Sequence, residues 1–590
     1  LNGRNFEYMG EDPFLAARMC VPYIQGVQEN GVAACVKHYA LNNQEHWRNH
    51  IDVQVSDRAL YEIYLPAFKA AVEEGKVWSI MGAYNKVRGT HAAHNKLLNN
   101  DILKGEWKFD GCVVTDWGAA HNTYEAAMNG LDLELGTFTN GLTSNSDQGY
   151  DSYYLGSAYL RMVKEGKVPM NVVDDKASRV LRLIFRTAMN VDGKFGAMSN
   201  DSHYETAYQV ATEGVVLLKN EAEFKGESLL PLKQGKYKHI LVVGDNAVRN
   251  LMAGGGSSEL KPKMVITPLE ALVKELGSDC VTFSQGYMAG RPMFDRADVI
   301  PQSVADSLYN AAIEEARKAD LVIFMGGLNK NYQQDCEGED RLAYELPFGQ
   351  NRLIEGLQKA NKKLVVVLTS GNAVAMPWLK EVPSLVQSWY LGSIGGKALA
   401  DVLLGKVTPS GKLPFSYPAK LEDCPAHYYG EISYPGDSIR QEYKEDILVG
   451  YRWYDTKHIQ PLFPFGYGLS YTRFEYGKPA ISAREMTDDD VLEIRCSVKN
   501  VGNVAGKETV QLYIGDEKCR VLRPVKELKG FYKVALQPGE EREIVFTVDK
   551  EDLMFFDDQL HDWVAEPGKF KAYIGSSSKD IKGVVAFELK

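Results

Sequence analysis

Short, uninterrupted runs of apolar residues recur through residues 1–420, and they constrain the fold more than any other feature of the chain. Between them lie longer segments whose apolar residues have the spacing of one face of a helix. Strands and helices that alternate in this way form parallel sheets with both faces covered. The runs with the clearest pattern are GVVLLKN, HILVVGDNA, VTFSQG, LVIFMGGL and KKLVVVLTSGN. They predict a doubly wound α/β sandwich domain over residues 205–420.

The same alternation, with shorter strands, is present in residues 1–190. A helix is expected to begin at Ser56, and Pro66 should kink it. The strands expected here are Val32 to Val36, Trp78 to Ala83, Cys112 to Val114 and Leu131 to Leu135. This βα repeat predicts a TIM-like β/α barrel over residues 1–190, although fewer strands precede Asp116 than a complete eightfold barrel needs.

Residues 476–590 change to strict alternation of apolar and polar side chains. Charged or hydroxyl residues separate Leu492, Ile494 and Val498, and the segment from Ile544 to Val548 repeats the pattern. A period of two, interrupted by Pro-Gly and Asn-Val-Gly turns, is typical of an antiparallel β-sandwich. We therefore expect a separate β-sandwich domain at this end of the chain, with its aromatic residues in the core or at an interface.

Two segments have weak periodicity and are interpreted as linkers. The segment 191–204 is a short linker that joins the first two predicted domains. Residues 421–475 are rich in Tyr, Pro and Gly, and a segment of this length with little regular pattern is expected to extend over other surfaces.

Composition excludes several classes of partner. The formal net charge of −11 argues against a nucleic acid or an anionic membrane surface. No apolar run is long enough for a membrane span. The 8 cysteines are scattered without a C-x-x-C pair, so no zinc site is expected, and Cys35 and Cys112 should be free, buried thiols. Any signal peptide would lie upstream of Leu1, and we favour a periplasmic or secreted location.

The first candidate for chemistry is Asp116, which ends the apolar run GCVVTDWG. It should lie at the carboxyl end of a buried strand, where αβ barrels carry their catalytic residues. The flat face of Trp117 beside it suits a sugar ring. The alternative is that Asp116 caps the helix that follows.

Charged and aromatic residues also stand at the other predicted strand ends. These residues are Arg4, Lys37, His38, Met81 and Tyr84. The adjacent pair of Lys37 and His38 can donate hydrogen bonds to the hydroxyls of a polyol, and its charge favours the ionised form of a nearby carboxyl. Each motif alone could be structural, but their recurrence at successive strand ends favours a binding site.

A second acidic candidate lies in the loop DCEGEDR, Asp335 to Arg341, which follows the strand LVIFMGGL. Such a loop can simply be a solvated surface loop. However, cleavage of a glycosidic bond needs one carboxylate as nucleophile and one carboxylic acid to protonate the leaving oxygen. The run Gly254 to Gly256 does not match G-x-G-x-x-G after a strand, so a nucleotide-dependent oxidoreductase is disfavoured and a loop lining a domain interface is expected.

An ordered series of motifs resembles glycoside hydrolase family 3, above all its β-glucosidases with a C-terminal fibronectin-III-like domain. The motifs are GRNFEYMGEDP, KHYALNNQE, SDRALYEIYLPAF, IMGAYNKVRG, GCVVTDWG, GGGSS, CEGEDR, PSGKLPFSYP and FPFGYGLSYT. The resemblance covers essentially the whole chain. It implies a TIM-like barrel, an α/β sandwich and a fibronectin-III-like domain, with the active site between the first two and neither metal nor cofactor.

The resemblance also implies roles for single residues. Asp116 matches the nucleophile and Glu337 the acid/base, with Glu339 as the competitor for the second role. The residues that match the sugar-binding subsite are Arg4, Lys37, His38, Met81, Tyr84 and Trp117. In such a pair the acid should hold a raised pKa and the nucleophile a low one, and Arg4 and Lys37 would supply the difference.

The implied activity is retaining, exo-acting hydrolysis of terminal β-D-glucosyl residues, on β-linked oligosaccharides or aryl and alkyl β-glucosides. β-Xylosidase or another β-glycosidase activity is the alternative. The family has a substantial segment before its GRNFE-like motif, so we expect the barrel to lack its N-terminal part. Either a second chain or a swapped segment supplies this part, or the sequence is truncated, or the strands are rearranged. A homo-oligomer is a separate possibility. A different class of protein, a truncated carbohydrate-binding protein without catalysis, would also fit a barrel that stays incomplete.

Overall fold

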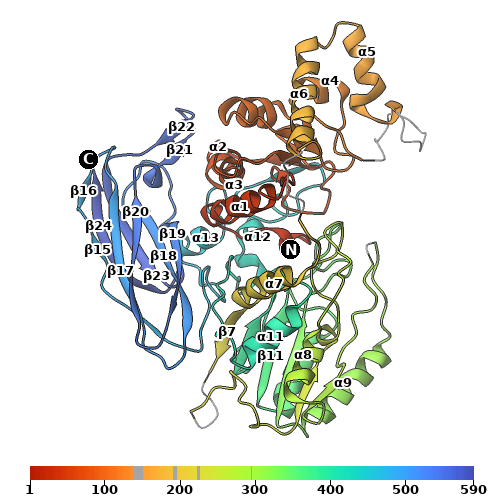
Figure 1. Cartoon of the computed structure of the whole chain (residues 1–590), viewed down its shortest axis with the longest axis vertical. Coiled ribbons are helices and arrows are strands. Elements are labelled where there is room, and N and C mark those ends of the chain that lie inside the picture. The colour runs from red at the N-terminus through yellow and green to blue at the C-terminus, as the bar shows by residue number, and fades with distance from the viewer. Residues whose placement is uncertain (137–149, 191–195, 222–225, 294) are drawn as a thin grey trace.

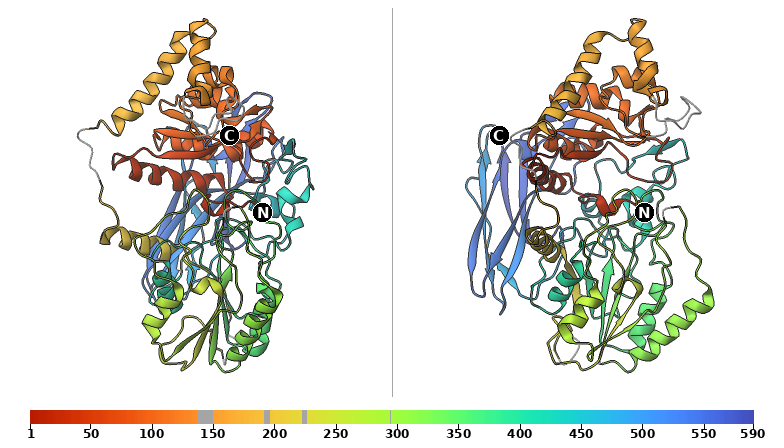
Figure 2. Two further views of the ribbon diagram at one scale, coloured as in Figure 1. Left: turned by 90° about the vertical axis from the view of Figure 1, so that its right-hand side faces the viewer. Right: turned by 45° about the vertical axis from the view of Figure 1, so that its right-hand side comes forward.

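The computed structural model describes residues 1–136, 150–190, 196–221, 226–293 and 295–590. The predicted linker at 191–204 therefore lies partly outside the described residues. An N-terminal α/β unit lies above a second α/β unit in Figure 1, and a β-sandwich stands beside both of them (Figures 1 and 2). The predicted fold class, multidomain α/β with a C-terminal β-sandwich, is confirmed.

The N-terminal unit contains a parallel sheet in the order β1-β3-β6. Its strands are β1 (Cys35–Tyr39), β3 (Ser79–Gly82) and β6 (Cys112–Thr115). The register pairs Cys35 with Ser79 and Ser79 with Cys112, so the three carboxyl ends meet at one edge. The strand predicted at 131–135 is wrong, because only Leu133 forms a parallel bridge, to Val114.

Cys35 was also expected to be buried, and this prediction is wrong. Strand β1 begins at Cys35 and is an outer strand of the described sheet, so the thiol is exposed, whereas Cys112 in β6 is buried. All eight cysteines are free thiols.

The helix predicted from Ser56 forms as expected and is interrupted at Pro66. The hydroxyl of Ser56 accepts a hydrogen bond from Ala59 N (2.9 Å), which caps the first turn. Because proline cannot donate a backbone hydrogen bond, Pro66 starts a new helix. The helices of this unit are η1 (Asn5–Glu7), α1 (Pro13–Gln28), α2 (Asp57–Ala59), η2 (Leu60–Tyr64), α3 (Pro66–Glu73), η3 (Ala92–His94), η4 (Leu97–Glu106), α4 (Thr123–Met128), η5 (Tyr150–Ser152), η6 (Tyr154–Ala158), α5 (Tyr159–Lys164) and α6 (Met170–Arg186).

The second unit is built on a six-stranded sheet in the order β7-β12-β11-β10-β8-β9. The strands are β7 (Val216–Asn220), β8 (Ile240–Val243), β9 (Val281–Ser284), β10 (Leu321–Gly327), β11 (Leu364–Thr369) and β12 (Ser384–Gln387). All neighbours are parallel except β7 and β12. The strand order reverses between β8 and β10, and open α/β sheets bind ligands outside the carboxyl ends at such a point.

Helices cover both faces of this sheet (Figure 1). They are α7 (Asp201–Gly214), η7 (Asp245–Ala247), α8 (Pro268–Leu276), α9 (Gln302–Ala316), α10 (Gln350–Ala360) and α11 (Gly395–Leu403). Strand β10 is buried along its whole length, as its continuous apolar sequence predicts. The loop that follows β10 carries the acidic motif CEGEDR.

Residues 421–475 contain short packed elements. They are η8 (Leu421–Asp423), α12 (Pro425–Tyr428), β13 (Arg440–Glu442), α13 (Tyr451–Thr456) and β14 (Phe474–Tyr476). Strand β13 pairs in parallel with β2 (Asp52–Gln54), which extends through β4 (Lys86–Val87) to β5 (Thr90–His91). Tyr451 and Trp453 in α13 are fully buried. The segment that sequence alone reads as an extended linker therefore fastens the units to one another.

The C-terminal sandwich has the predicted alternation. In β17 (Leu492–Asn500) every second residue from Leu492 onward is buried. One sheet has the order β14-β17-β15 with β20 also on β17, and the other has the order β16-β24-β23-β18-β19. The remaining elements are β15 (Ala480–Ile481), β16 (Glu485–Met486), β18 (Gly506–Asp516), β19 (Glu527–Leu536), β20 (Glu541–Val548), η9 (Glu551–Leu553), β23 (Gly568–Gly575) and β24 (Ile581–Leu589).

A hairpin of the sandwich packs against the N-terminal unit. Its strands are β21 (Phe555–Asp557) and β22 (Asp562–Val564). The ring of Phe556 stacks on Tyr61 of η2 with centroids 4.1 Å apart and an interplanar angle of 2°. The N–H of Phe556 donates to Glu62 Oε1 (3.0 Å). The sandwich thus contacts and supports helix η2 of the N-terminal unit.

We expect Phe556→Ala to destabilise this contact by about 3 kcal/mol or more, because the ring is only 2% exposed and its removal leaves a cavity. Urea unfolding followed by tryptophan fluorescence measures the loss. The control is Tyr532→Ala in the same sandwich, where the side chain is 54% exposed and the expected change is within about 0.5 kcal/mol. Equal stability of the two variants would contradict the conclusion that the hairpin of the sandwich stabilises the N-terminal unit.

Candidate active site

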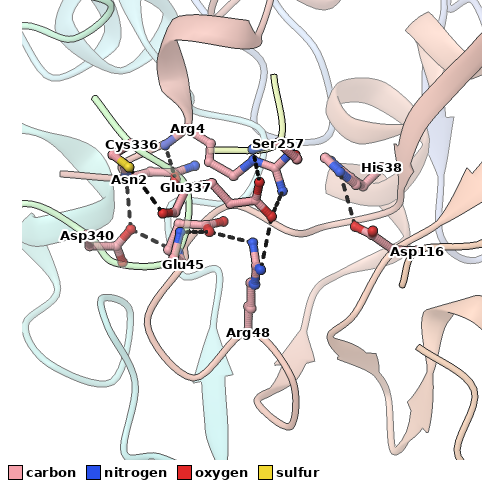
Figure 3. Close-up of polar contacts among 12 residues, drawn as sticks. Asn2, Arg4, His38, Glu45, Arg48, Asp116, Ser257, Cys336, Glu337 and Asp340 are labelled. Carbon is pink, nitrogen blue, oxygen red and sulfur yellow. Dashed lines mark hydrogen bonds and ion pairs between the residues drawn. The ribbon is translucent and has the colours of Figure 1, made fainter. Parts of the chain in front are cut away.

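The carboxyl ends of β1, β3 and β6 bring several of the predicted residues together. His38 lies near the end of β1, Met81 in β3, and Asp116 directly after β6. His38 Nε2 is 3.3 Å from Asp116 Oδ2, and both residues are buried (Figure 3). The parallel register accounts for this meeting, since it aligns the ends of neighbouring strands.

His38 is a neutral imidazole. Burial lowers its pKa, and the charges of Arg4, Lys37 and Arg48 lower it further, to about 2. The Tyr8 hydroxyl lies 2.8 Å from Nδ1 and can donate to it, which assigns the ring proton to Nε2, facing Asp116. Neither Nε2 nor Asp116 Oδ2 makes a well-aligned hydrogen bond to a described residue. The two atoms face each other within ion-pair distance, so a polar ligand that binds here competes with this contact.

Arg4 and Lys37 form ion pairs with carboxylates other than Asp116. Arg4 Nε forms a short ion pair with Glu7 Oε1, and its Nη1 lies 3.5 Å from Glu337 Oε1. Lys37 Nζ is 3.3 Å from Glu7 Oε2. The ion-pair partners of these two cations are therefore Glu7 and Glu337, and the ring of His38 is what faces Asp116.

Glu337 is held at the centre of a cationic site formed by both α/β units (Figure 3). The N–H of Ser257 donates to its Oε2 (2.9 Å), and Arg48 Nη2 donates to its Oε1 (3.1 Å). Burial raises its pKa, but Ser257, Arg4 and Arg48 outweigh burial and lower the pKa to about 2. The expectation of a raised pKa for this group is wrong, because the sequence of the loop does not reveal the two arginines that the other unit supplies.

The glycine run has the interface position predicted for it. A Cβ at Gly254 would lie 2.6 Å from the ring of Phe6, and a Cβ at Gly256 would lie 2.4 Å from Glu337 Cβ. Gly256 also has a φ of +102°, which side chains other than glycine rarely adopt. The Glu337 N–H donates to Gly255 O (3.1 Å). The run packs glycine backbone directly against the N-terminal segment and the acidic loop.

Aromatic residues border both carboxylates. The guanidinium of Arg48 lies 4.6 Å from the ring centroid of Tyr84. Burial raises the pKa of Tyr84, the charge of Asp116 raises it further and that of Arg48 lowers it, so this phenol interacts with both groups. Trp117 is 58% exposed at the rim, and Met81 is half-buried. Tyr84 thus connects the two halves of the site.

Glu339, the competitor of Glu337, points elsewhere. Its carboxylate lies 3.6 Å from His46 Nδ1, and its side chain is 37% exposed. Of the two glutamates only Glu337 makes ion pairs with Arg4 and Arg48.

Sequence reasoning missed Glu7, Glu45, Arg48 and Asp340. Glu7, Glu45 and Asp340 stand inside the quoted motifs GRNFEYMGEDP, KHYALNNQE and CEGEDR, and Arg48 follows the second of them by three residues. Their charge within or close to recognised motifs was the signal that could have found them. Burial raises the pKa of Glu45 to about 7, although Arg48 and Arg4 oppose this. Among the described residues, no group of three or more His, Cys, Asp or Glu side chains is placed to hold a metal ion. No described helix is long and apolar enough to cross a membrane.

Comparisons with known proteins match both α/β units to one family. The family model for the glycosyl hydrolase family 3 N-terminal domain matches residues 1–183, and that for its C-terminal domain matches residues 215–471. The chain belongs to glycosyl hydrolase family 3. A fibronectin type III-like domain matches residues 508–578 of this family 3 hydrolase. Because the N-terminal match starts at residue 1, it gives no support to the expectation that part of the barrel is lacking.

Relatives of the family 3 hydrolase cover its whole length. A β-glucosidase of Bacteroides ovatus is 73% identical over 100% of this chain and 79% of its own. The thermostable β-glucosidase B of Acetivibrio thermocellus is 41% identical over 98% of this chain and 72% of its own. The solved structure of DesR, a β-glucosidase from Streptomyces venezuelae in complex with D-glucose, matches with a TM-score of 0.90 and 30% identity over 100% of this chain and 86% of that one.

Proposed function

We propose that this glycoside hydrolase is a retaining, exo-acting β-glucosidase that removes terminal non-reducing β-D-glucosyl residues. The observation that supports it most is the pair of buried carboxylates Asp116 and Glu337, contributed by different α/β units to one site. The names of its relatives support glucosides as substrates. β-Linked oligosaccharides and aryl or alkyl β-glucosides are the expected compounds.

In the proposed mechanism Asp116 Oδ2 attacks the anomeric carbon while Glu337 gives a proton to the glycosidic oxygen. The bond to the aglycone breaks, and a covalent glucosyl ester forms on Asp116. Glu337 then takes a proton from water, the water oxygen attacks the anomeric carbon, and the ester breaks to release glucose with its original anomeric configuration. Retention by this route needs carboxyl groups about 5–5.5 Å apart in the complex.

The residues around Asp116 are proposed to hold the sugar. Arg4, Lys37 and the Nε2–H of His38 are donors for ring hydroxyls, and Met81, Tyr84 and Trp117 provide apolar and aromatic surface. In the free site Glu7 neutralises Arg4 and Lys37, so a sugar has to compete with that carboxylate. A hydroxyl that draws Arg4 away from Glu337 also removes one of the charges that lower the pKa of the acid.

We expect Asp116→Asn to lower kcat for 4-nitrophenyl β-D-glucoside by about 10⁴-fold or more, because the amide cannot form the ester intermediate. Glu337→Gln should retain kcat/KM for 2,4-dinitrophenyl β-D-glucoside, whose leaving group needs no acid, while its kcat falls because the attacking water has lost its base. Release of nitrophenol measures both, with 4-nitrophenyl β-D-xyloside as the test of sugar preference. A fully active Asp116→Asn enzyme would overturn the nucleophile assignment, and faster xyloside turnover would overturn the glucosidase assignment.

Arg48 should set the pH range in which Glu337 works. Removing its charge in Arg48→Gln raises the pKa of Glu337, so the protonated acid persists to higher pH. We expect the alkaline limb of the kcat/KM profile to move up by about one pH unit. Arg48→Lys keeps the positive charge and should stay closer to wild type. An alkaline limb that does not move, or moves down, would contradict the charge effect.

A further inference from the structure

Two carboxylates, one from each loop, hold the loop after β1 and the loop after β10 together (Figure 3). Glu45 Oε2, from the loop after β1, accepts a hydrogen bond from Gly338 N (2.7 Å), the residue directly after Glu337. Asp340, from the loop after β10, accepts from Glu45 N (2.9 Å) and His46 N (3.2 Å). Each loop thus binds the backbone of the other, through Gly338 and Asp340, one and three residues after Glu337.

Asp340 also fixes the N-terminal segment at the same place. Its Oδ1 accepts from Gly3 N (3.1 Å), and Gly3 precedes Arg4. A Cβ on Gly3 would lie 2.3 Å from Glu339 O, so the N-terminal backbone packs directly on the acidic loop. One carboxylate therefore aligns two segments of the first unit with the loop that carries Glu337.

Arg48 joins this arrangement to the Glu337 carboxyl. Its Nη1 lies 2.5 Å from Glu45 Oε2, and its Nη2 lies 3.1 Å from Glu337 Oε1. The side chains of Glu45 and Arg48 are 2% and 14% exposed. Charge-assisted hydrogen bonds in a buried site of this kind are stronger and more directional than exposed ones.

The proposed reaction changes the charge of Glu337, so the contact of Arg48 with its other partner, Glu45, becomes important. Glu337 has to lose and regain a proton in each turnover, so its attraction for Arg48 changes during the cycle. Glu45 takes no part in bond making, and its carboxyl accepts the Gly338 N–H in either protonation state. Arg48 and the backbone at Glu337 therefore keep a fixed partner while the charge of Glu337 changes.

We propose that Glu45, together with Asp340, is a positioning residue that fixes Glu337 across the domain interface for proton transfer to the leaving group. This inference rests on the proposed β-glucosidase function. It assigns a catalytic consequence to Glu45, the last residue of the motif KHYALNNQE, which sequence analysis left without a role. Loss of such a positioning residue slows bond cleavage for leaving groups that need the acid and spares bond cleavage for leaving groups that do not.

The test compares kcat/KM for three aryl β-D-glucosides, with 2,4-dinitrophenol, 4-nitrophenol and phenol as leaving groups. General acid catalysis contributes about 10²–10⁴-fold, and the need for it grows with the pKa of the leaving group. In Glu45→Gln we expect a loss within about threefold for the dinitrophenyl glucoside and about 100-fold for the phenyl glucoside. Asp340→Asn should show the same trend, and thermal unfolding confirms that each variant is folded.

Glu11→Gln is the matched control. Glu11 is another carboxyl at a contact between segments, where it accepts from Ser416 N and Tyr451 N (2.8 Å each), but it makes no bond to the acidic loop. Its loss, if any, should be equal for the three substrates. A uniform loss in both Glu45→Gln and Asp340→Asn, or no loss in either, overturns the positioning role. A wild-type enzyme inactive on all three glucosides overturns the proposed function itself.

Discussion

The structure of the site depends on one buried carboxylate, Glu337, held between two units of the chain. Its own unit supplies the backbone N–H of Ser257, while Arg4 and Arg48 come from the N-terminal unit. A buried charge is costly unless it is paired and hydrogen-bonded, so the two units stabilise this group only when they are docked. Docking and assembly of the site are therefore the same event.

Other parts of the chain maintain that docking at a distance. Strand β13 from the segment between the second α/β unit and the sandwich pairs with β2 of the first unit, and α13 of the same segment is buried. The hairpin of the sandwich places Phe556 on Tyr61, behind the N-terminal sheet. These contacts lie far from the carboxylates, but they restrict the rotation of one unit against the other. Such restriction matters because proton transfer and nucleophilic attack tolerate only small displacements.

The apolar pattern of the strands, and the polar residues that follow each strand, could predict the part of the site that lies on one sheet. His38 and Asp116 follow buried strands whose parallel register is fixed by their apolar patterns, so their meeting was foreseeable. The contacts of Glu337 were not, because Arg48 and Ser257 reach it from loops that no local pattern brings together. For the same reason the sign of the pKa shift at Glu337 came out opposite to the prediction.

The central claim is that Asp116 forms the covalent intermediate while the acid comes from the other unit. The most direct measurement is mass spectrometry of proteolytic peptides after reaction with 2,4-dinitrophenyl 2-deoxy-2-fluoro-β-D-glucoside, whose fluorine slows hydrolysis of the glycosyl ester. The account predicts one added fluoroglucosyl group on the peptide that contains Asp116, with loss of activity in step with labelling. A label on Glu337 or on another carboxylate would contradict it.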